Sequence, residues 1–592
     1  MLAFGAGDSG SNPDGTTHLI FRIFTVQMIY SYSVYYTNEH YIYLLTHHSN
    51  NPVGTMKFIF VSGGVISGLG KGITASSIGR LLMSRGLNIS AIKIDPYLNI
   101  DAGTMNPFEH GEVYVLEDGG EVDLDLGNYE RFMGLKLTRD HNITTGKVYR
   151  SVIEKERHGD FLGKTVQIIP HITNEIKDRI MDVSRRTGAD VVIVELGGTV
   201  GDIESMPFLE AVRQLGSEIG HENALYVHTT LIPVMGSVGE QKTKPTQHSV
   251  KELMGIGIRP DVIVGRSKEP MSQDIREKIS ASCGVPPEAV ISSPDARSIY
   301  EVPMILERQG IADYIINRMN LKPYTTKRDM KDWESFLDRI LHPSKEVTIA
   351  LVGKYTKLAD SYLSHIEAFA HAGAEVGTKV HVKMIDSDDL IKNGTSALDD
   401  VHGIIVPGGF GIRGVEGMIE ATRYARENGV PFLGVCLGFQ IATIGIARHV
   451  LGLADANSTE FDEKTKDPVI FMMGEQTTVE DKGATMRLGA QDVCIKEGSV
   501  AYGLYDATKI SERHRHRYEV NPAYIDRFEE AGWMFTGRSD GGRRMEIGEL
   551  KGHPFFVASQ FHPEFKSEPM KPTPLHLGLV KAAVRFMESK KA

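Results

Sequence analysis

The sequence predicts an α/β protein with two doubly wound parallel-sheet domains. Two stretches predict this most directly, residues 57–74 and 430–447, because each joins an apolar run to a helical pattern through a glycine-rich turn. Apolar runs without polar alternation are typical of parallel strands that are covered on both faces. The length of 592 residues leaves room for more than one such domain.

Composition narrows the class of protein. The apolar fraction of 41% and the charged fraction of 24% are ordinary for a soluble globular chain. The formal net charge of −11 argues against a general nucleic-acid binder, although it is compatible with local basic pockets for phosphates. Cys283, Cys436 and Cys494 lie far apart without metal-ligand spacing. This indicates a reducing, cytoplasmic compartment and no disulfide framework.

Residues 1–55 differ in composition from the rest of the chain. They are rich in Tyr, Ile, Ser and Asn and poor in Lys and Glu. The apolar stretch Leu19–Tyr30 contains Arg22 and lacks the flanks of a signal peptide, so we expect no membrane span and no cleaved leader. We expect Met56 to be the functional start and residues 1–55 to be a non-catalytic or disordered extension.

The first domain, expected over residues 56–320, opens with a pattern that is typical of phosphate binding. The strand Phe58–Val61 leads into a glycine-rich loop, and Lys71 follows where a helix begins. Glycines let backbone amides approach phosphates, and the helix N-terminus and Lys71 favour their charge. Gly72 stands where the standard P-loop has a Ser or Thr that binds magnesium, so carboxylates should take that role. A simple tight turn is the alternative.

Carboxylates follow this loop in two places. The acidic segment 117–125 ends in Asp125, and Glu195 lies at the carboxyl end of the apolar strand that begins at Ala189. Open α/β sheets bind ligands at that end of their strands, and oxygen donors beside phosphates indicate Mg²⁺. For the acidic segment, a solvated or calcium-binding turn is the alternative. A carboxylate that ends an apolar strand is costly unless it is paired or bound to metal.

Two polar segments could belong to a second nucleotide site. Residues 201–204 open a helix with acidic side chains, and residues 239–248 place Lys242 and Lys244 in a proline-containing loop before another helix. Lysines, hydroxyls and amides of this kind can bind a triphosphate. A solvated surface is the alternative for the basic loop.

The second domain is expected over residues 346–592. Residues 321–345 are charged and contain proline, so they predict an interdomain linker with one amphipathic helix. The strand Val347–Val352 then opens a new series of alternating strands and helices.

Cys436 lies at a sharp turn between the apolar strand 430–435 and a helix. Gly434 and Gly438 stand two residues to either side, as a strained nucleophile elbow requires. A helix N-terminus stabilises a thiolate. A lone cysteine is more often a small buried apolar residue, so a nucleophile is predicted only if a base is also present.

His562 and Glu564 supply that base at the end of another apolar strand. In an extended segment, side chains two residues apart share one side, so Glu564 could orient the imidazole. Together with the elbow, the pair predicts a Cys–His–Glu catalytic triad.

Pro407–Gly411, the Cys436 elbow and the His562–Glu564 pair, in this order, resemble a class I (triad) glutamine amidotransferase. The resemblance implies glutamine hydrolysis through a thioester, release of ammonia, and backbone amides of Gly409 and Leu437 as oxyanion donors. It assigns the following residues to the glutamine pocket: Gly409, Leu437, Gly438, Phe439, Gln440, Glu460 and Arg517. The charge-dense segment 513–518, which contains Arg517, has a solvated edge as its alternative.

Ser67–Gly72, Asp118–Leu126, Gly197–Glu204 and Lys242–Gln247, with the C-terminal amidotransferase pattern, resemble the CTP synthase family from Met56 to the C-terminus. The resemblance implies a P-loop-like (dethiobiotin-synthetase-like) amidoligase domain fused to a class I glutamine amidotransferase domain. It implies ATP-dependent amination of UTP at the 4-position through 4-phosphoryl-UTP, with ammonia from glutamine or free ammonia. It also implies Mg²⁺ with ATP, activation by GTP, inhibition by CTP, and a homotetramer that acts in pyrimidine biosynthesis.

The same resemblance assigns residues to the nucleotides. ATP would contact Gly68, Leu69, Gly70, Lys71, Gly72, Ile73, Asp125, Pro294, Asp295 and Ala296. The family often has lysine in place of Pro294, so only a backbone contact is carried over there. Asp125 and Glu195 would hold magnesium. UTP and inhibitory CTP would contact Ser67, Asp202, Ile203, Glu204, Lys242, Thr243, Lys244, Pro245, Thr246, Gln247 and Lys278.

Two other functions share part of these patterns. One is another amidotransferase with a P-loop-like synthetase, such as a cobyrinic acid diamide synthetase. Lys242–Gln247 with Asp202–Glu204 argue against it, because their layout suits a triphosphate nucleotide. The other is a filament-forming or regulatory nucleotide sensor without activity. The presence of Cys436, His562 and Glu564 argues against that function.

Overall fold

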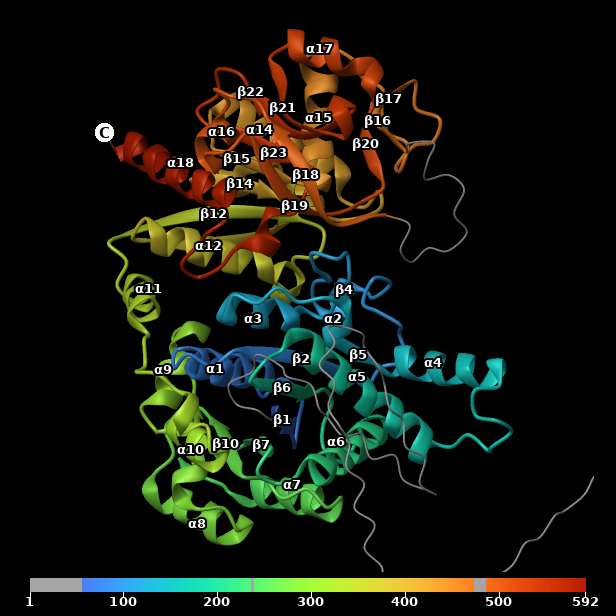
Figure 1. Ribbon diagram of the computed structural model, residues 1–592. Coiled ribbons are helices and arrows are strands. Elements are labelled where there is room, and N and C mark those ends of the chain that lie inside the picture. The colour runs from blue at the N-terminus through green and yellow to red at the C-terminus, as the bar shows by residue number, and fades with distance from the viewer. Residues whose placement is uncertain (1–55, 236–238, 473–485, 592) are drawn as a thin grey trace, which may run out of the picture. The chain divides into compact units, whose positions relative to one another are not determined.

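The structure is a computed structural model that describes residues 56–235, 239–472 and 486–591 (Figure 1). The extension predicted at residues 1–55 lies outside these described residues. Two large sheets organise the part of the chain that is described.

The first sheet has seven parallel strands in the order β11-β10-β7-β1-β6-β2-β5. The strands are β1 (Lys57–Gly63), β2 (Ile89–Asp95), β5 (Asn142–Thr144), β6 (Val191–Leu196), β7 (Ala224–Leu231), β10 (Val262–Ser267) and β11 (Val290–Pro294). Every residue of β1 is buried, with Phe58 and Phe60 facing one layer and Ile59 and Val61 the other. Burial on both faces is the reason for the continuous apolar runs.

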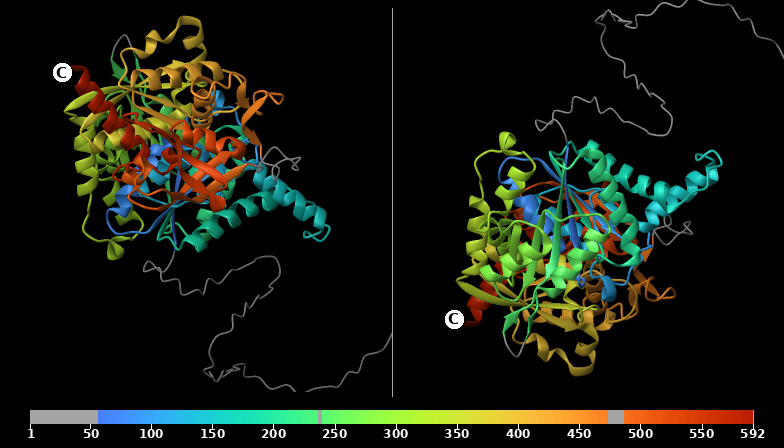
Figure 2. Two further views of the ribbon diagram at one scale, coloured as in Figure 1. Left: turned by 90° about the horizontal axis from the view of Figure 1, so that it is seen from above. Right: turned by 90° about the horizontal axis from the view of Figure 1, so that it is seen from below.

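Helices cover both faces of this sheet, as the doubly wound fold predicts (Figures 1 and 2). One face packs against α1 (Lys71–Met83), α3 (Leu124–Met133), α9 (Val302–Glu307) and α10 (Ile311–Arg318). The other packs against α4 (Thr145–His158), α5 (Thr173–Thr187), α6 (Met206–Ile219), α7 (Lys244–Gly255) and α8 (Gln273–Cys283). Between β2 and α3 lie α2 (Pro107–His110) and the hairpin β3 (Tyr114–Val115) and β4 (Glu121–Val122); β8 (Val234–Met235) and β9 (Glu240–Gln241) precede α7.

The second sheet has nine strands in the order β13-β12-β14-β15-β23-β22-β21-β18-β19. Its parallel part is β12 (Lys345–Gly353), β13 (Thr378–Asp386), β14 (Gly403–Val406), β15 (Phe432–Val435) and β23 (Phe556–Ser559). The sheet then continues through four antiparallel strands that the sequence analysis did not anticipate: β22 (Arg544–Leu550), β21 (Trp533–Ser539), β18 (Arg487–Ile495) and β19 (Lys509–His516).

Helices again cover both faces of the parallel part. One face packs against α12 (Leu363–Glu375), α16 (Val500–Tyr505) and α18 (Pro574–Lys591), and the other against α13 (Ser387–Asn393), α14 (Val415–Asn428) and α15 (Leu437–His449). A small sheet of β16 (Ala456–Ser458), β17 (Asp467–Met472) and β20 (Tyr518–Val520), together with α17 (Ile525–Glu530), completes the described elements.

The predicted linker contains a helix that is firmly packed. The helix α11 (Lys331–Leu341) buries Trp333 and Phe336 completely. The Trp333 ring lies 5.3 Å from the ring of Phe132, and its indole N–H donates to the carbonyl of Tyr300 at 2.9 Å. This helix is therefore part of the core on the α1 and α3 face of the first sheet.

We expect Trp333→Ala to lower the free energy of unfolding by about 3–5 kcal/mol, because it empties a closed aromatic site. Differential scanning calorimetry would detect this as a lower Tm of the transition that contains the first sheet. Ser335→Ala, at an exposed position of the same helix, is the control and should leave Tm unchanged. An unchanged Tm for Trp333→Ala would contradict the assignment of α11 to the core.

Candidate active sites

The glycine-rich loop after β1 faces the loop after β6 at the carboxyl edge of the first sheet. The N–H of Val200 donates to the carbonyl of Gly63 at 2.8 Å, and Lys71 Nζ donates to the carbonyl of Gly198 at 2.8 Å. A small cavity of about 10 Å³ lies between the end of β1, the loop after β6 and the start of α6. This is the edge where open α/β sheets bind their ligands.

A buried carboxylate, Glu195, and a half-buried one, Asp125, share one lysine beside these loops. Lys93 Nζ lies 2.9 Å from Glu195 Oε1 and also donates to Asp125. The hydroxyl of Tyr129 donates to the other oxygen of Glu195. Lys93 and Glu195 are directly opposite one another in the pairing of β2 with β6. Lys93 is not among the site residues expected from the sequence, although a lysine inside the apolar run of β2 was the available signal.

Burial and neighbouring charges shift the pKa values of this cluster. Burial raises the pKa of Glu195 above its ordinary value, and the charge of Lys93 only partly opposes this. Burial also acts to raise the pKa of Asp125, but Lys93 outweighs it, so the pKa of Asp125 is lowered. Burial lowers the pKa of Lys71. An anionic phosphate beside Lys71 would therefore favour its charged form.

The carboxylates converge on the space above Gly72. A Cβ atom at this position would collide with Asp125 Oδ1 and would lie 3.4 Å from Glu195 Oε2. A serine or threonine, as in the standard P-loop, would therefore displace Asp125. Two carboxylates that point to one place form the oxygen donor set that Mg²⁺ prefers, so these residues fit the metal that the resemblance implies.

The helix α7 brings the basic segment to the same edge. A Cβ at Gly64 would collide with Ser249, and a Cβ at Gly201 would lie 3.1 Å from Glu252 Oε2. Since Ser249 and Glu252 both belong to α7, this helix packs against the loops that follow β1 and β6. Its first residue is Lys244, which follows Thr243.

Some of the residues assigned to UTP lie at the start of α7, and others lie in the segment after β6. Gln247 Nε2 donates to Thr243 Oγ1 at 3.0 Å, and the side chain of Ile203 is exposed. The carboxylate of Asp202 accepts the N–H of Thr199 at 3.0 Å. Thr246 is completely buried, and its hydroxyl donates to the carbonyl of Leu231 at 3.2 Å. Thr246 therefore anchors α7 to the end of β7.

The residues assigned to adenine lie further along the sheet. Pro294 is the last residue of β11, and Asp295 and Ala296 follow it; β11 is separated from β1 by β10 and β7. Asp295 forms an ion pair with Arg266 at 2.7 Å. Lys278 lies on α8 and near Glu240, whose carboxylate pairs with Lys242 Nζ at 2.6 Å.

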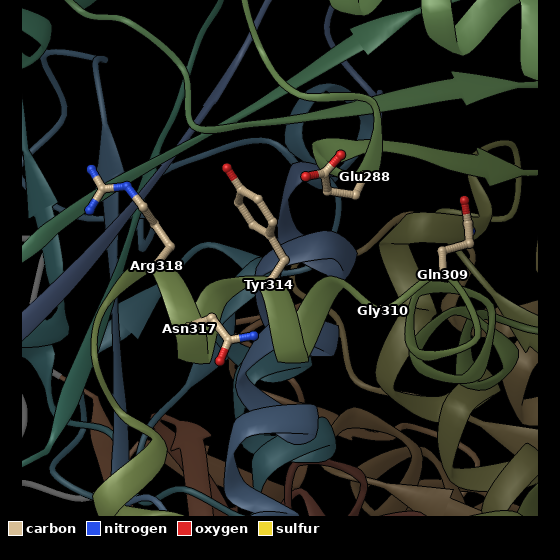
Figure 3. Close-up of a pocket in the computed structure, with 6 residues that line it drawn as sticks. All are labelled: Glu288, Gln309, Gly310, Tyr314, Asn317 and Arg318. Carbon is tan, nitrogen blue, oxygen red and sulfur yellow. The ribbon is translucent and has the colours of Figure 1, made fainter.

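A surface hollow of about 560 Å³ is formed at α10 and contains none of the predicted site residues (Figure 3). Arg318 Nε pairs with the carboxylate of Asp261 at 2.9 Å, and the Tyr314 hydroxyl donates to the backbone carbonyl of Asp261 at 3.3 Å. Gln309 Nε2 donates to the carbonyl of Ser292 at 2.8 Å. Three of the six lining residues thus have partners within the protein, and we assign the hollow no function.

The second site is centred on Cys436, between β15 and α15. Its backbone has φ 54° and ψ −100°, which is strained for a residue other than glycine. A Cβ at Gly434 would lie 2.7 Å from the carbonyl of Gly438, and a Cβ at Gly438 would collide with the carbonyl of Val406. Only glycines fit around this elbow, as the sequence predicted.

His562 and Glu564 are paired, but not in the way that the sequence analysis assumed. The segment is not extended, because Pro563 begins a 3₁₀ turn that includes Glu564. This turn brings Glu564 Oε1 to 2.6 Å from His562 Nδ1. A Cβ at Gly408 would lie 2.9 Å from His562 Cε1 and 3.7 Å from Cys436 Cβ. Gly408 therefore leaves room for the imidazole beside the thiol.

The pKa of His562 is raised and the pKa of Glu564 is lowered. Burial alone would lower the pKa of His562, but Glu564 and Cys436 outweigh it and raise this pKa to about 10. Burial would raise the pKa of Glu564, but His365 and His562 lower it to about 2. At neutral pH the pair is therefore an imidazolium and a carboxylate, and an imidazolium can give its proton to a leaving amine.

Several predicted glutamine-pocket residues lie around the thiol. Glu460 Oε1 accepts the N–H of Gly411 at 2.7 Å. Burial raises the pKa of Glu460, whereas that hydrogen bond and the charges of Lys354 and Arg517 oppose the shift. A Cβ at Gly409 would lie 3.3 Å from Leu437 Cδ2. The two residues assigned to the oxyanion hole are therefore neighbours.

Other residues of this pocket are not all as the sequence predicted: one predicted side chain lies in the core, and two residues near the thiol were not predicted. The Phe439 side chain is completely buried in the core, so only its backbone can face a ligand. Gln440 Nε2 donates to Gln560 Oε1 at 3.3 Å, and Gln560 Nε2 is 3.9 Å from Cys436 Sγ. Lys354 Nζ donates to the carbonyl of Phe410 at 3.1 Å. Neither Gln560 nor Lys354 was expected here from the sequence, although a polar residue directly after an apolar strand was the available signal for both.

Comparison with known proteins identifies the family. The family model described as "CTP synthase N-terminus" matches residues 57–321, and the one described as "Glutamine amidotransferase class-I" matches residues 357–582. The CTP synthase of Archaeoglobus fulgidus is 57% identical to this chain over 531 residues, which are 90% of this chain and 99% of the relative. The chain belongs to the CTP synthase family. The family relative from Methanococcus maripaludis is also 57% identical, over 536 residues that are 89% of this chain and 100% of that relative.

The chain is therefore a carbon–nitrogen ligase with glutamine as its amide donor, and its catalysis depends on ATP. Its small-molecule substrates are UTP, ATP and glutamine. The CTP synthase family is thus the correct one of the two enzyme families that the sequence left open. The T. brucei CTP synthase glutaminase domain with bound acivicin is 40% identical and covers 40% of this chain and 94% of its own, with a TM-score of 0.39.

No helix within the described ranges has both the length and the hydropathy of a membrane span.

We expect Gly72→Ser to lower ammonia-dependent CTP formation by about 10²-fold, because the added side chain displaces Asp125. Gly72→Ser introduces the residue that the standard P-loop has at this position. Comparison with that motif alone would therefore predict faster CTP formation. A spectrophotometric assay of CTP with free ammonia measures the effect, and glutamine hydrolysis by the same variant is the control. Normal CTP formation would show that Asp125 need not occupy its present position.

Proposed function

We propose that this chain makes CTP from UTP with two separate groups of its own residues. The loop after β1 with Lys71, Asp125 and Glu195 activates UTP, and Cys436 with His562 and Glu564 releases ammonia from glutamine. The observation that carries the proposal is the presence, in one chain, of a buried carboxylate–lysine cluster at a sheet edge and a strained cysteine elbow beside an ion-paired histidine.

In the first half, the oxygen at position 4 of UTP attacks the γ-phosphorus of ATP, and ADP leaves. Loop amides and Lys71 hold the phosphates, while the segments that contain Asp202–Glu204 and Lys242–Gln247 hold UTP. Asp125 and Glu195 would hold Mg²⁺, which neutralises charge on phosphate oxygens when bound. Ammonia then adds to carbon 4 of 4-phosphoryl-UTP, and inorganic phosphate leaves.

In the second half, Cys436 Sγ attacks the carboxamide carbon of glutamine. The amides of Gly409 and Leu437 stabilise the oxyanion, and His562 gives its proton to the departing ammonia. Water then hydrolyses the thioester and releases glutamate. Neutral His562 then takes a proton from that water. Glu564 keeps the imidazole oriented throughout, because it lies 2.6 Å from Nδ1.

Further properties follow the family resemblance. We propose activation by GTP, inhibition by CTP at a site that overlaps that of UTP, a homotetramer, and a cytoplasmic location. The domain division proposed is 56–320, 321–345 and 346–592, and the residue ranges of the two family matches support it. Asp202–Glu204 and Lys242–Gln247 near the loops of the first sheet support the shared UTP and CTP site.

We expect Cys436→Ala to lower glutamine-dependent CTP formation by about 10⁴-fold or more, because no other nucleophile is present in the elbow. CTP formation from free ammonia should persist, since the first site is intact. The measurement is CTP formation with each nitrogen donor, with and without GTP. Equal loss with both donors would contradict the proposal of two separate sites.

We expect Lys71→Ala to lower CTP formation by about 10²–10³-fold with either nitrogen donor, because it removes a fixed cation from the phosphate site. Glutamine hydrolysis without nucleotides should be retained and serves as the control for folding. If ammonia-dependent synthesis survives in this variant, the phosphate-binding role of the glycine-rich loop is wrong.

A further inference from the structure

One arginine of β19 contacts both halves of the chain. The backbone carbonyl of Arg513 accepts the N–H of His562 at 2.8 Å. Its buried guanidinium reaches the first half, where Nη1 lies 2.8 Å from Glu130 Oε2 and 2.9 Å from the carbonyl of Val115. The backbone of Arg513 is thus linked to the catalytic histidine and its side chain to the synthetase half.

The partner of Arg513 belongs to the helix that begins at the nucleotide site. The helix α3 carries Asp125 in its first turn and Glu130 in its second. The carboxylate of Asp123 caps this helix by accepting the N–H of Asp125 at 2.9 Å. Since a short capped helix moves as a unit, a shift of Asp125 is transmitted to Glu130 and hence to Arg513.

The hydroxyl of Tyr114, on β3, is a second link at the same place. It lies 2.7 Å from Glu130 Oε2 and 2.7 Å from the carbonyl of Phe565, and Arg513 Nη1 lies 3.1 Å from it. A hydroxyl has one proton, so it can fully satisfy only one of the two acceptors. One acceptor belongs to the synthetase half, and the other directly follows Glu564.

The catalytic histidine is in contact with this second link as well. The ring of Phe565 stacks on the ring of His562, with centroids 5.1 Å apart. A change at Glu130 can therefore reach His562 through the carbonyl of Arg513 or through Phe565. Both routes end at the residue that must hold a proton beside Cys436.

We propose that Arg513 is a positioning residue that couples occupancy of the nucleotide site to glutamine hydrolysis, with Glu130 and Tyr114 as its partners in the synthetase half. The inference rests on the proposed function, because it assumes that Asp125 belongs to the nucleotide site and that His562 acts on glutamine. In this arrangement, binding of ATP and UTP adjusts α3, and Arg513 passes the adjustment to His562.

The test compares glutamine hydrolysis with and without ATP and UTP. In Arg513→Gln, the stimulation by the two nucleotides should fall by about tenfold, a typical size for coupling between two sites. CTP formation from free ammonia should stay close to that of the wild type, because Arg513 touches no nucleotide residue directly. The KM for glutamine should change little, whereas kcat in the presence of nucleotides should fall.

Arg85→Gln is the matched control. Arg85 is as buried as Arg513 and forms an ion pair of 2.7 Å with Glu307, but both partners belong to the synthetase half. The Arg85→Gln variant should lower Tm about as much as Arg513→Gln does and should leave the stimulation of glutamine hydrolysis by nucleotides intact. If Arg513→Gln does not fold, Tyr114→Phe removes only the shared hydroxyl and should reduce the stimulation by about threefold, within the range of such couplings.

The outcomes separate this inference from the proposed function. If the wild type makes no CTP from UTP with any nitrogen donor, the proposed function is wrong. If the wild type makes CTP and both Arg513→Gln and Tyr114→Phe retain full nucleotide stimulation, only the coupling role is wrong. Arg85→Gln could also lose as much nucleotide stimulation as Arg513→Gln. The loss in Arg513→Gln would then be explained by general destabilisation of the fold, and the inference would be overturned.

Discussion

The pairing of charges that are buried away from water is the interaction on which both active sites depend. Asp125 and Glu195 converge above Gly72 because the ammonium of Lys93 offsets their charge. Without such a partner, the fully buried Glu195 would be too costly to keep ionised in the interior. The second site follows the same rule, since the imidazolium of His562 and the carboxylate of Glu564 stabilise one another at 2.6 Å. Burial and neighbouring charges therefore shift the pKa values of Glu195, His562 and Glu564.

Backbone geometry is the other requirement, and it differs between the two sites. At Gly72 a side chain would displace the carboxylate of Asp125, and at Gly438 it would collide with the backbone carbonyl of Val406. Cys436 must have a side chain, and it has one despite a positive φ. Its N–H donates to the carbonyl of Ser559 at 2.7 Å, which ties the strained residue to β23. The surrounding sheet thereby holds a conformation that an isolated peptide would avoid.

Local patterns in the sequence predicted much of the fold and part of each site. The strands β1 and β15, the glycine-rich loop and the cysteine elbow were predictable because neighbours along the chain determine them. A lysine inside the apolar run of β2 was a signal for Lys93, but its partner was not predictable, because the register between β2 and β6 sets it opposite Glu195. His562 and Glu564 were paired correctly for the wrong reason, since the turn at Pro563 rather than an extended backbone joins them.

The antiparallel end of the second sheet is a further place where the sequence pattern alone did not predict which side chains are buried. The alternating Arg and His residues of β19 were compatible with a solvated edge, yet Arg513 and His514 are buried. Arg513 is buried because Glu130, almost four hundred residues earlier, lies opposite it. A pattern within one segment cannot reveal a partner at that separation.

The packing of α11 has a practical consequence for anyone who wants to produce the two halves as independent proteins. Trp333 covers the rings of Phe132 and Tyr300, and all three belong to one buried cluster. A synthetase fragment that stops at residue 320 would expose this aromatic surface to water and would be prone to self-association. A fragment extended through Leu341 would keep the surface covered.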